Sequence, residues 1–329
     1  MVELKPLKND EFQLLHAAIA DLSPEAIVDG AIMDASLVVD ALRRLITENN
    51  IKNPAFGGSL SGHSVIIKKI QLPSMSENEL TESIQWEAEQ YIPFDINDVN
   101  LDYEVLDAGD GETMDVLLVA VKKDRIADYT SALVQAGRDP VLVDVDVFAV
   151  QNAYEVNYGL GDETVALVNV GASVMNINVL HARNSIFWRD VAFGGNQYTE
   201  AIQRELNLPR EDAERLKLGE RVGDHSVQQI MGVLNTVSED LAAELQKTID
   251  FFVATSSVDR LDRVVLSGGS AQVLNLEEVL KERFQVEVEI MNPFRNIRYS
   301  ESDFDPEWIN RHAPAMAVAV GLAVRTVGD

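Results

Sequence analysis

The most informative hydrophobic pattern in this chain is a pair of apolar segments that each run directly into a glycine turn. The first covers residues 164–170 and leads into small residues at 171–173, and the second covers 263–266 and leads into the turn at 267–270. Continuous β-branched and aliphatic residues are typical of strands buried on both faces. Small residues after such a strand allow backbone N–H groups to approach an anion. With a further glycine pair at 194–195, which opens a predicted helix, the pattern favours a phosphate-binding cleft over simple turn geometry.

In the first part of the chain, the spacing of apolar residues predicts strands and helices in turn. Residues 2–7 and 12–18 flank a short polar turn and predict a β-hairpin. Asp34 is positioned to cap a helix with apolar residues on one face. Residues 64–103 predict a compact insert with two strands and one helix, which begins with a capping box at 76–79.

After the insert, the pattern changes to strand, helix and strand. A glycine turn at 108–111 precedes a predicted strand at 115–121, a helix that ends at Gly137 and a strand at 140–144. This order is typical of a βαβ unit, which implies that its strands are parallel. A glycine-containing segment at 159–162 is the predicted boundary between two lobes.

The second part of the chain opens with three predicted antiparallel strands at 165–170, 174–180 and 185–191. A long amphipathic helix follows, and its apolar face consists of Val237, Leu241, Leu245, Ile249 and Phe252. The small residues at 315–323 predict a final helix that packs closely against the core. The alternation of strands and helices predicts an α/β fold.

Composition restricts the function. The chain has 329 residues, enough for two lobes, and a formal net charge of -27, which disfavours nucleic acid and anionic lipid as partners. No apolar stretch reaches the length of a membrane span or resembles a signal peptide, so we expect a cytoplasmic protein. The chain has no cysteine, and its 5 histidines do not have the spacing of metal ligands.

Specific segments resemble a known family. The glycine turns, the Ala213-Glu214-x-x-Lys217 helix and the small-residue final helix resemble the actin, Hsp70 and FtsA superfamily. Within it, residues 85–94, 143–149 and 291–294 resemble the PilM family of type IV pilus assembly proteins. The resemblance implies a two-lobed, actin-like (RNase H-like) fold with an FtsA-like inserted subdomain. The implied division is subdomain 1A at 1–56 and 108–160 with the C-terminal helix 314–329, inserted subdomain 1C at 57–107, subdomain 2A at 161–196 and 261–313, and subdomain 2B at 197–260.

The resemblance also implies ATP or ADP with Mg²⁺ as the ligand. Carried over by position, the residues that contact it are Asn169, Gly171, Ala172, Ser173, Gly194, Gly195, Glu214, Lys217, Gly268, Gly269 and Ser270. By spacing alone, Glu214 and Lys217 are better explained as an ordinary surface ion pair, and only the resemblance favours a role in binding the ligand.

Two departures from the superfamily pattern predict weak nucleotide binding and, at most, very slow ATP hydrolysis. Members begin with a strand and an Asp-Ile-Gly-Ser phosphate loop, and we expect this first strand of lobe 1 to be missing from the sequence. Asn169 replaces an aspartate that helps to organise the metal, and a neutral amide cannot neutralise Mg²⁺. Two alternatives stay open: a sugar-kinase-like phosphotransferase, with Asp144 or Asp146 as the catalytic base, and an adaptor that needs no nucleotide.

As a partner, the resemblance implies the N-terminal cytoplasmic tail of PilN, bound in a groove between the first subdomain and the insert. The tail would hold the chain at the inner membrane without any membrane insertion of its own, and self-association and other platform proteins of the pilus are further expected contacts. The insert helix is predicted to dock partners, with Tyr91 on its apolar stripe and Trp86 outside it. The residues expected to line the groove or anchor the partner are Ile70, Leu72, Trp86, Tyr91, Ile92 and Phe94, and the alternative for each is ordinary subdomain core.

Overall fold

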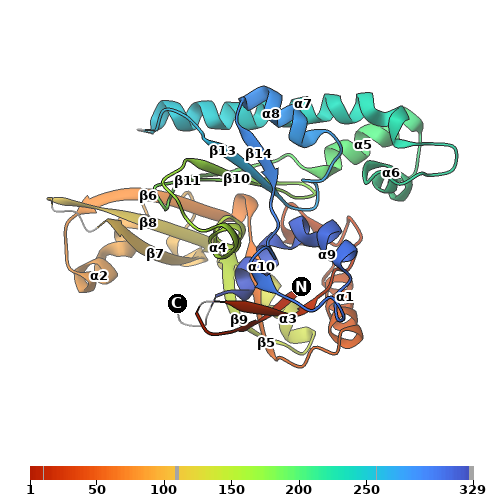
Figure 1. Cartoon of the computed structure of the whole chain (residues 1–329). Coiled ribbons are helices and arrows are strands. Elements are labelled where there is room, and N and C mark those ends of the chain that lie inside the picture. Colours follow the sequence, from red (N-terminus) through yellow and green to blue (C-terminus); the bar gives the residue numbers. More distant parts are fainter. Residues whose placement is uncertain (10, 108–110, 257, 326–329) are drawn as a thin grey trace. The chain divides into compact units, whose positions relative to one another are not determined.

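The computed structural model describes residues 1–9, 11–107, 111–256 and 258–325 (Figure 1). The first three residues of the predicted glycine turn at 108–111 and the last four of the predicted C-terminal helix 314–329 lie outside these ranges. By their contacts, the residues form two units. Unit 1 contains residues 1–19 and the chain from Asp146 onward, and unit 2 contains residues 20–145.

The described part of unit 1 is built on a five-stranded sheet with the order β12-β11-β10-β13-β14. Its strands are β10 (Val165–Val170), β11 (Met175–His181), β12 (Asn184–Val191), β13 (Arg263–Ser267) and β14 (Glu287–Ile290). The first three pair antiparallel, as predicted, whereas β13 pairs parallel with both β10 and β14. Every residue of β10 is buried, because helices cover both faces of the sheet.

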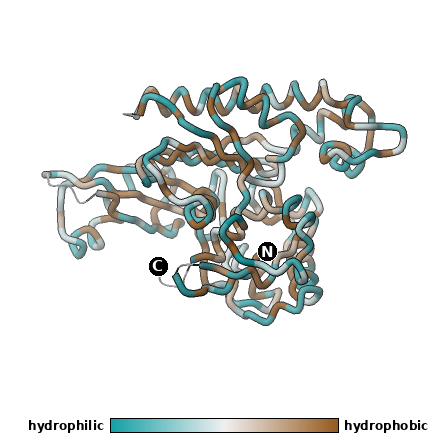
Figure 2. Tube along the Cα trace, in the orientation of Figure 1, coloured by the Kyte–Doolittle hydropathy of each residue, from teal (hydrophilic) through white to brown (hydrophobic). Residues whose placement is uncertain are grey.

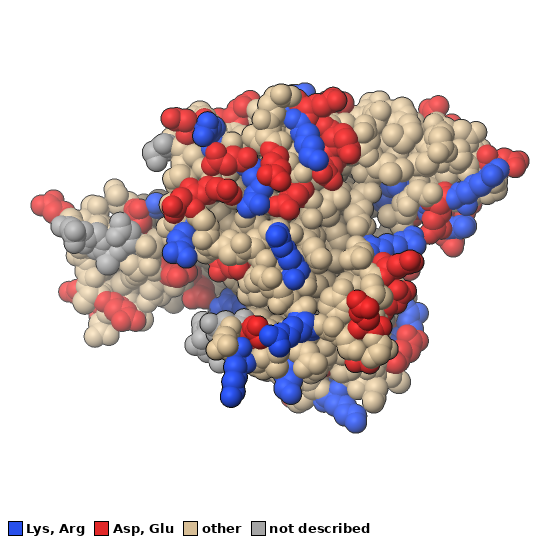
Figure 3. Space-filling view, viewed as in Figure 1, with Lys and Arg blue, Asp and Glu red and all other residues tan. Residues whose placement is uncertain are grey.

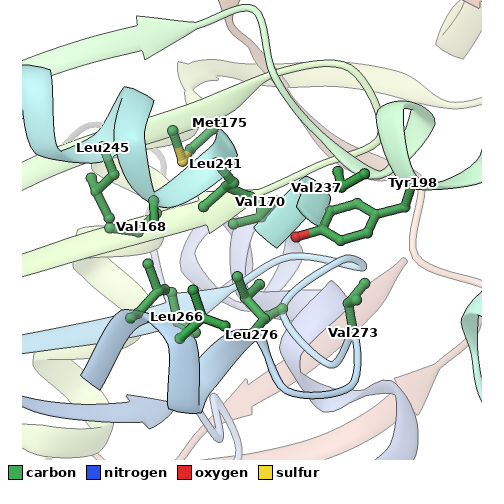
Figure 4. Close-up of a cluster of buried hydrophobic side chains, with 14 of the residues drawn as sticks. Val168, Val170, Met175, Tyr198, Val237, Leu241, Leu245, Leu266, Val273 and Leu276 are labelled. Carbon is green, nitrogen blue, oxygen red and sulfur yellow. The ribbon is translucent and has the colours of Figure 1, made fainter. Parts of the chain in front are cut away.

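One face of this sheet packs against the helices between β12 and β14. They are α5 (Gly195–Leu206), α6 (Arg210–Lys217), α7 (Val227–Thr255) and α8 (Leu276–Phe284). Val168 and Val170 of β10 face Tyr198 of α5 and Leu241 of α7 (Figure 4). The brown and teal residues alternate along α7 in Figure 2, and this is the amphipathic pattern that the sequence predicts.

The opposite face of the sheet packs against α4 (Asp146–Tyr158) and α10 (Ala317–Ala323). Before α10 come α9 (Pro306–His312) and the 3₁₀ turn η3 (Ala313–Met316). A Cβ atom at Gly321 would lie 1.6 Å from the carbonyl oxygen of Ala149 in α4, so this glycine allows the two helices to touch. The close packing predicted for the C-terminal helix is therefore confirmed.

The chain start adds a smaller sheet to unit 1. Strands β1 (Val2–Pro6) and β2 (Phe12–Ala17) form the predicted hairpin, and β15 (Ile297–Arg298) pairs with β2. Leu14 and Ile297 bury their side chains in the same core as α4 and α10.

In unit 2, the insert forms an antiparallel sheet with the order β6-β8-β7. Its strands are β6 (Val65–Pro73), β7 (Val99–Asp107) and β8 (Thr113–Lys122), with 3₁₀ turns η1 (Gly62–Ser64) and η2 (Ile96–Asp98). Helix α2 (Glu77–Ala88) packs Leu80, Ile84 and Ala88 on this sheet. The predicted capping box is present, since Ser76 and Glu79 each bond the backbone N–H of the other.

The rest of unit 2 contains a parallel pair of strands, β5 (Ala55–Leu60) and β9 (Asp139–Val145). Helices α1 (Ala35–Glu48) and α3 (Lys123–Gln135) contact each other, and α3 also contacts both strands. The Asp34 side chain caps α1 as predicted. Strands β3 (Ile27–Val28) and β4 (Ala31–Ile32) form a short hairpin that the sequence pattern did not predict.

The predicted βαβ unit at 115–144 is wrong. Strand β8 pairs antiparallel with β6 and β7, and β9 pairs in a separate sheet with β5. Both edges of β8 are occupied by insert strands, so none is left for β9. The contact division of the chain falls at 19/20 and 145/146, whereas the expected lobe boundary was 159–162. The four-subdomain division stays a prediction.

Candidate nucleotide site

The three predicted glycine turns lie side by side in unit 1, at the ends of β10 and β13. The carbonyl oxygen of Gly171 accepts from the N–H of Gly195 (2.9 Å) and from Oγ of Ser270 (3.1 Å). The N–H of Ser270 donates to the carbonyl oxygen of Val170 (3.0 Å), and the N–H of Asn196 donates to that of Ala172 (2.7 Å). Sequence positions about a hundred residues apart therefore meet at one edge of the sheet.

Two glycines are required by this close approach. A Cβ atom at Gly194 would lie 2.6 Å from the Gly171 carbonyl oxygen, and one at Gly268 would lie 2.4 Å from that of Val170. Gly268 also has a φ of +91°, which L side chains rarely adopt. Substituting either glycine would push the turns apart.

Some backbone donors in these turns are used internally and others are not. The N–H groups of Gly171, Gly194 and Gly268 all donate within the protein. Among the residues that the structure describes, those of Ala172, Ser173 and Gly269 have no partner. Ala172 and Gly269 are exposed and Ser173 is half-buried. Consecutive N–H groups without a partner in a tight turn, as at Ala172 and Ser173, are suited to bind an anion such as phosphate.

Glu214 and Lys217 of α6 hold the first turn of α5. The Lys217 ammonium lies 2.6 Å from Oε2 of Glu214, 3.0 Å from Oγ1 of Thr199 and 3.3 Å from the carbonyl oxygen of Gly195. The hydroxyl of Thr199 bonds the other oxygen of Glu214. Lys217 is only 6% exposed, so the ordinary surface ion pair is excluded for this residue.

This arrangement limits what the pair can do for a ligand. Burial lowers the pKa of the Lys217 ammonium, although the Glu214 carboxylate opposes that effect. An ammonium has three donors, and the contacts within the protein occupy all of them, so Lys217 acts on the turn and has none left for a purine. The Glu214 side chain is 35% exposed and keeps lone pairs available to ribose hydroxyls.

Asn169, at the end of β10, is buried in a polar row. Its Nδ2 donates to Oδ1 of Asn176 (2.9 Å), and its Oδ1 accepts from Oγ of Ser267 (3.2 Å). Within the described residues, no group of three or more His, Asp or Glu side chains is arranged to hold a metal ion. The donor set near the turns, an amide and hydroxyls, offers Mg²⁺ no negative charge at position 169.

The two predicted catalytic carboxylates lie where the chain passes from unit 2 to unit 1. Asp144 is near the end of β9 and accepts from the N–H of Val145 (2.7 Å). Asp146 is the first residue of α4. Both have interactions in the protein. Their proposed role as a base stays a prediction.

The residues predicted to bind a partner fall into two groups in unit 2. Three of them are buried in the core between α2 and its sheet: Ile70, Leu72 and Ile92. This burial agrees with the alternative that they are ordinary core residues of the subdomain. Phe94 is half-buried under the Lys122 ammonium, 4.4 Å from the ring centre.

The other two are exposed. Trp86 is 72% exposed on α2, as its position outside the apolar stripe predicts. Tyr91 is 40% exposed, and its predicted place on that stripe is wrong because the helix ends at Ala88.

The sequence pattern missed Thr199, Asn196 and Arg210 as parts of the site. Arg210 of α6 reaches both the side-chain oxygen of Asn196 and, at 3.8 Å, Oε1 of Glu214. Arg210 and Glu214 are four positions apart on one helix, and this spacing was a usable signal. Thr199 gave no signal, because its partners come from another helix.

The mixed sheet of unit 1, with its glycine turns at the ends of β10 and β13 and helices on both faces, is that of an actin-like α/β protein. Residues 1–327 match the family described as "Type IV pilus assembly protein PilM", and the chain belongs to this family. The resemblance found in the sequence is thereby confirmed.

Solved structures that are similar to this chain include a PilM-PilN complex and an ethanolamine utilization protein. One is described as "PilM-PilN type IV pilus biogenesis complex": it is 27% identical, the match covers 100% of this chain and 95% of that chain, and the TM-score is 0.88. The other is the ethanolamine utilization protein EutJ from Carboxydothermus hydrogenoformans, 15% identical, with 91% of this chain and 77% of that chain covered and a TM-score of 0.54. The second similarity concerns the fold alone.

Across the described residues, no helix is long and apolar enough to cross a membrane.

Proposed function

We propose that this protein is a nucleotide-binding scaffold of the type IV pilus machinery that recruits the cytoplasmic tail of a PilN partner at the inner membrane. One observation carries the nucleotide part: the turns hold unpartnered N–H groups at Ala172, Ser173 and Gly269, and Lys217 links the partly exposed Glu214 carboxylate to Gly195 of the same turns. Membership of the PilM family and the similarity to the PilM-PilN complex support the partner.

In this proposal, the turn at 171–173 binds the phosphates and Glu214 accepts hydrogen bonds from the ribose. Lys217 keeps the Gly195 carbonyl and Thr199 in place. Asn169 adds no carboxylate that would hold Mg²⁺ beside the phosphates. We therefore expect ATP and ADP to bind more weakly than micromolar, with very slow hydrolysis.

Calorimetric titration of ADP tests the nucleotide site. Glu214→Gln removes the charge that ribose hydroxyls would meet, and Glu211→Gln, on the same helix and outside the Glu214–Lys217–Arg210 cluster, is the matched control. We expect Glu214→Gln to weaken ADP at least several-fold and Glu211→Gln to leave it unchanged. If both variants bound ADP with equal affinity, Glu214 would not be the residue that contacts the ribose. Micromolar or tighter ADP binding by the unmodified chain would contradict the expected weak binding.

One observation favours a second candidate, an adaptor that needs no nucleotide. The three donors of Lys217 are all satisfied without a ligand, and so are both ends of the Asn169 amide. Because these groups already hydrogen-bond within the protein, the site can have a purely structural role. The same titration separates the two, since the adaptor predicts no heat with ADP or ATP at millimolar concentration.

For the partner, we propose that α2 and the segment after it are part of the docking surface. Trp86 is the most exposed large apolar side chain on α2, and exposed aromatic residues frequently dominate binding energy. Its helix carries acidic residues at 77, 79, 82 and 87. Acidic side chains are also spread over the visible surface in Figure 3. Both features suit a tail that carries basic and apolar residues.

A synthetic PilN-tail peptide from the same organism tests this. We expect micromolar binding that weakens as salt rises, because part of the attraction is screened charge. Trp86→Ala should weaken binding at least tenfold and leave stability within about 0.5 kcal/mol, because the ring is mostly in solvent. Phe251→Ala, at a 55% exposed aromatic on α7 of unit 1, is the control. Equal binding by both variants would exclude Trp86 from the docking surface.

A further inference from the structure

A row of hydrogen-bonded side chains crosses four neighbouring strands of the unit 1 sheet. Ser267 of β13 donates to Asn169 of β10 (3.2 Å), Asn169 donates to Asn176 of β11 (2.9 Å), and Asn176 donates to Asp190 of β12 (2.8 Å). The strand register places each residue directly opposite the next. Asn169 lies inside the row, and only Val170 separates it from the turn at 171–173.

Chemistry fixes the direction of every bond in this row. The Asp190 carboxylate can only accept, so Asn176 must turn its NH₂ group toward it. The carbonyl oxygen of Asn176 then faces residue 169, which must donate. Asn169 donates through its NH₂ group and therefore presents its own oxygen to the Ser267 hydroxyl.

We propose that Asp190 is a positioning residue: through Asn176, it makes position 169 a neutral hydrogen-bond donor and keeps a carboxylate away from the phosphate end of the candidate site. An ionised aspartate at position 169 would face the carbonyl oxygen of Asn176. If Asn176 turned over, that oxygen would face Asp190 instead. Asn176 is 3% and Asn169 is 8% exposed, so water does not relieve a clash between these two residues. Asp190 is exposed, and a turned-over Asn176 would replace the hydrogen bond to its carboxylate with an oxygen–oxygen contact.

This inference rests on the proposed nucleotide site for its functional consequence. A nucleoside diphosphate bound at 171–173 would meet an uncharged amide at the end of β10. The site would then bind the diphosphate with an affinity that depends little on a divalent cation, because no carboxylate at 169 helps to hold one.

A double-mutant cycle tests the row itself. In the Asn169→Asp variant, the new carboxylate faces the side-chain oxygen of Asn176, and both groups can only accept. We therefore expect a clear fall in the urea midpoint of unfolding. Asp190→Asn alone should change the midpoint little, because an asparagine at 190 still accepts from Asn176. This single variant also measures any other contribution of the Asp190 charge to stability.

The double variant should recover most of the lost midpoint. Asn176 can turn over, donate to the new aspartate at 169 and accept from the amide at 190. A stable Asn169→Asp variant, or a double variant no more stable than Asn169→Asp, would overturn the proposal.

The functional readout is ADP affinity with and without Mg²⁺, which a purely structural role would not move. We expect less than a twofold effect of Mg²⁺ on the unmodified chain and a several-fold tightening by Mg²⁺ in the double variant. A tenfold effect on the unmodified chain would overturn the metal independence. If no variant binds ADP, the proposed nucleotide function fails, and the unfolding cycle still decides the role of Asp190.

Discussion

One added methyl group at Gly321 should separate two helices that now touch. The new Cβ atom would lie 1.6 Å from the carbonyl oxygen of Ala149 and 2.4 Å from its carbonyl carbon, whereas ordinary contact begins at 3.4 Å. Both obstructing atoms belong to the backbone of α4 and cannot rotate away. Helix α10 must therefore move outward by more than an ångström.

The cost follows from what α10 buries. Ala317 and Val320 are fully buried and Met316 is 1% exposed, so an outward shift opens space beneath all three. Overpacking a core typically costs about 1–3 kcal/mol when side chains can adjust. Because here a helix backbone has to move, we expect Gly321→Ala to lose about 3 kcal/mol or more.

Urea unfolding followed by circular dichroism measures this loss, and the chain offers a matched control. Gly232 lies within α7, and a Cβ atom there would have no atom within 4 Å. Gly232→Ala should stabilise by about 0.5–1 kcal/mol, since alanine favours a helix over glycine. The same chemical change thus has opposite signs at two sites. If Gly321→Ala left the unfolding midpoint unchanged, the close contact of α10 with α4 would be wrong.

Two further predictions concern buried ionisable groups. Burial raises the pKa of Tyr198, whose hydroxyl is bonded to Ser238 (2.9 Å), to about 12. In the unfolded chain a tyrosine loses its proton near pH 10, so the free energy of unfolding should fall by about 2–3 kcal/mol as the pH rises from 10 to 12. The Tyr198→Phe variant should lack this fall when urea midpoints are compared. Lys217→Met should lose about 1–3 kcal/mol at neutral pH, because charged hydrogen bonds disappear while the partly exposed Glu214 stays solvated. Since burial lowers the pKa of Lys217, the unfolded chain keeps this proton to a higher pH than the folded chain does. The stability that Lys217→Met loses relative to the unmodified chain should therefore grow as the pH rises toward 10.5. A loss that does not change with pH would contradict the lowered pKa.

Much of the secondary structure could be predicted from local sequence. The capping box at Ser76, the cap at Asp34 and the apolar spacing of α7 each act within a few residues of themselves. The pair of apolar strands with glycine turns also marked the candidate site, because a strand buried on both faces has a recognisable composition. Strand β5 was missed because Gly57 and Gly58 interrupt its pattern and glycine is rare within strands.

Which strands pair, and which side chains meet across strands or helices, was decided only by the tertiary structure. Strand β8 has the length and hydrophobicity expected of it, but its neighbours are β6 and β7 because both of its edges were taken within the insert. In the candidate site, Lys217 looked like half of a surface ion pair until α5 brought Thr199 and the Gly195 carbonyl against it. The row from Ser267 to Asp190 joins residues far apart in sequence. A local pattern records whether a residue is buried, and only the register of the assembled strands determines what it is buried against.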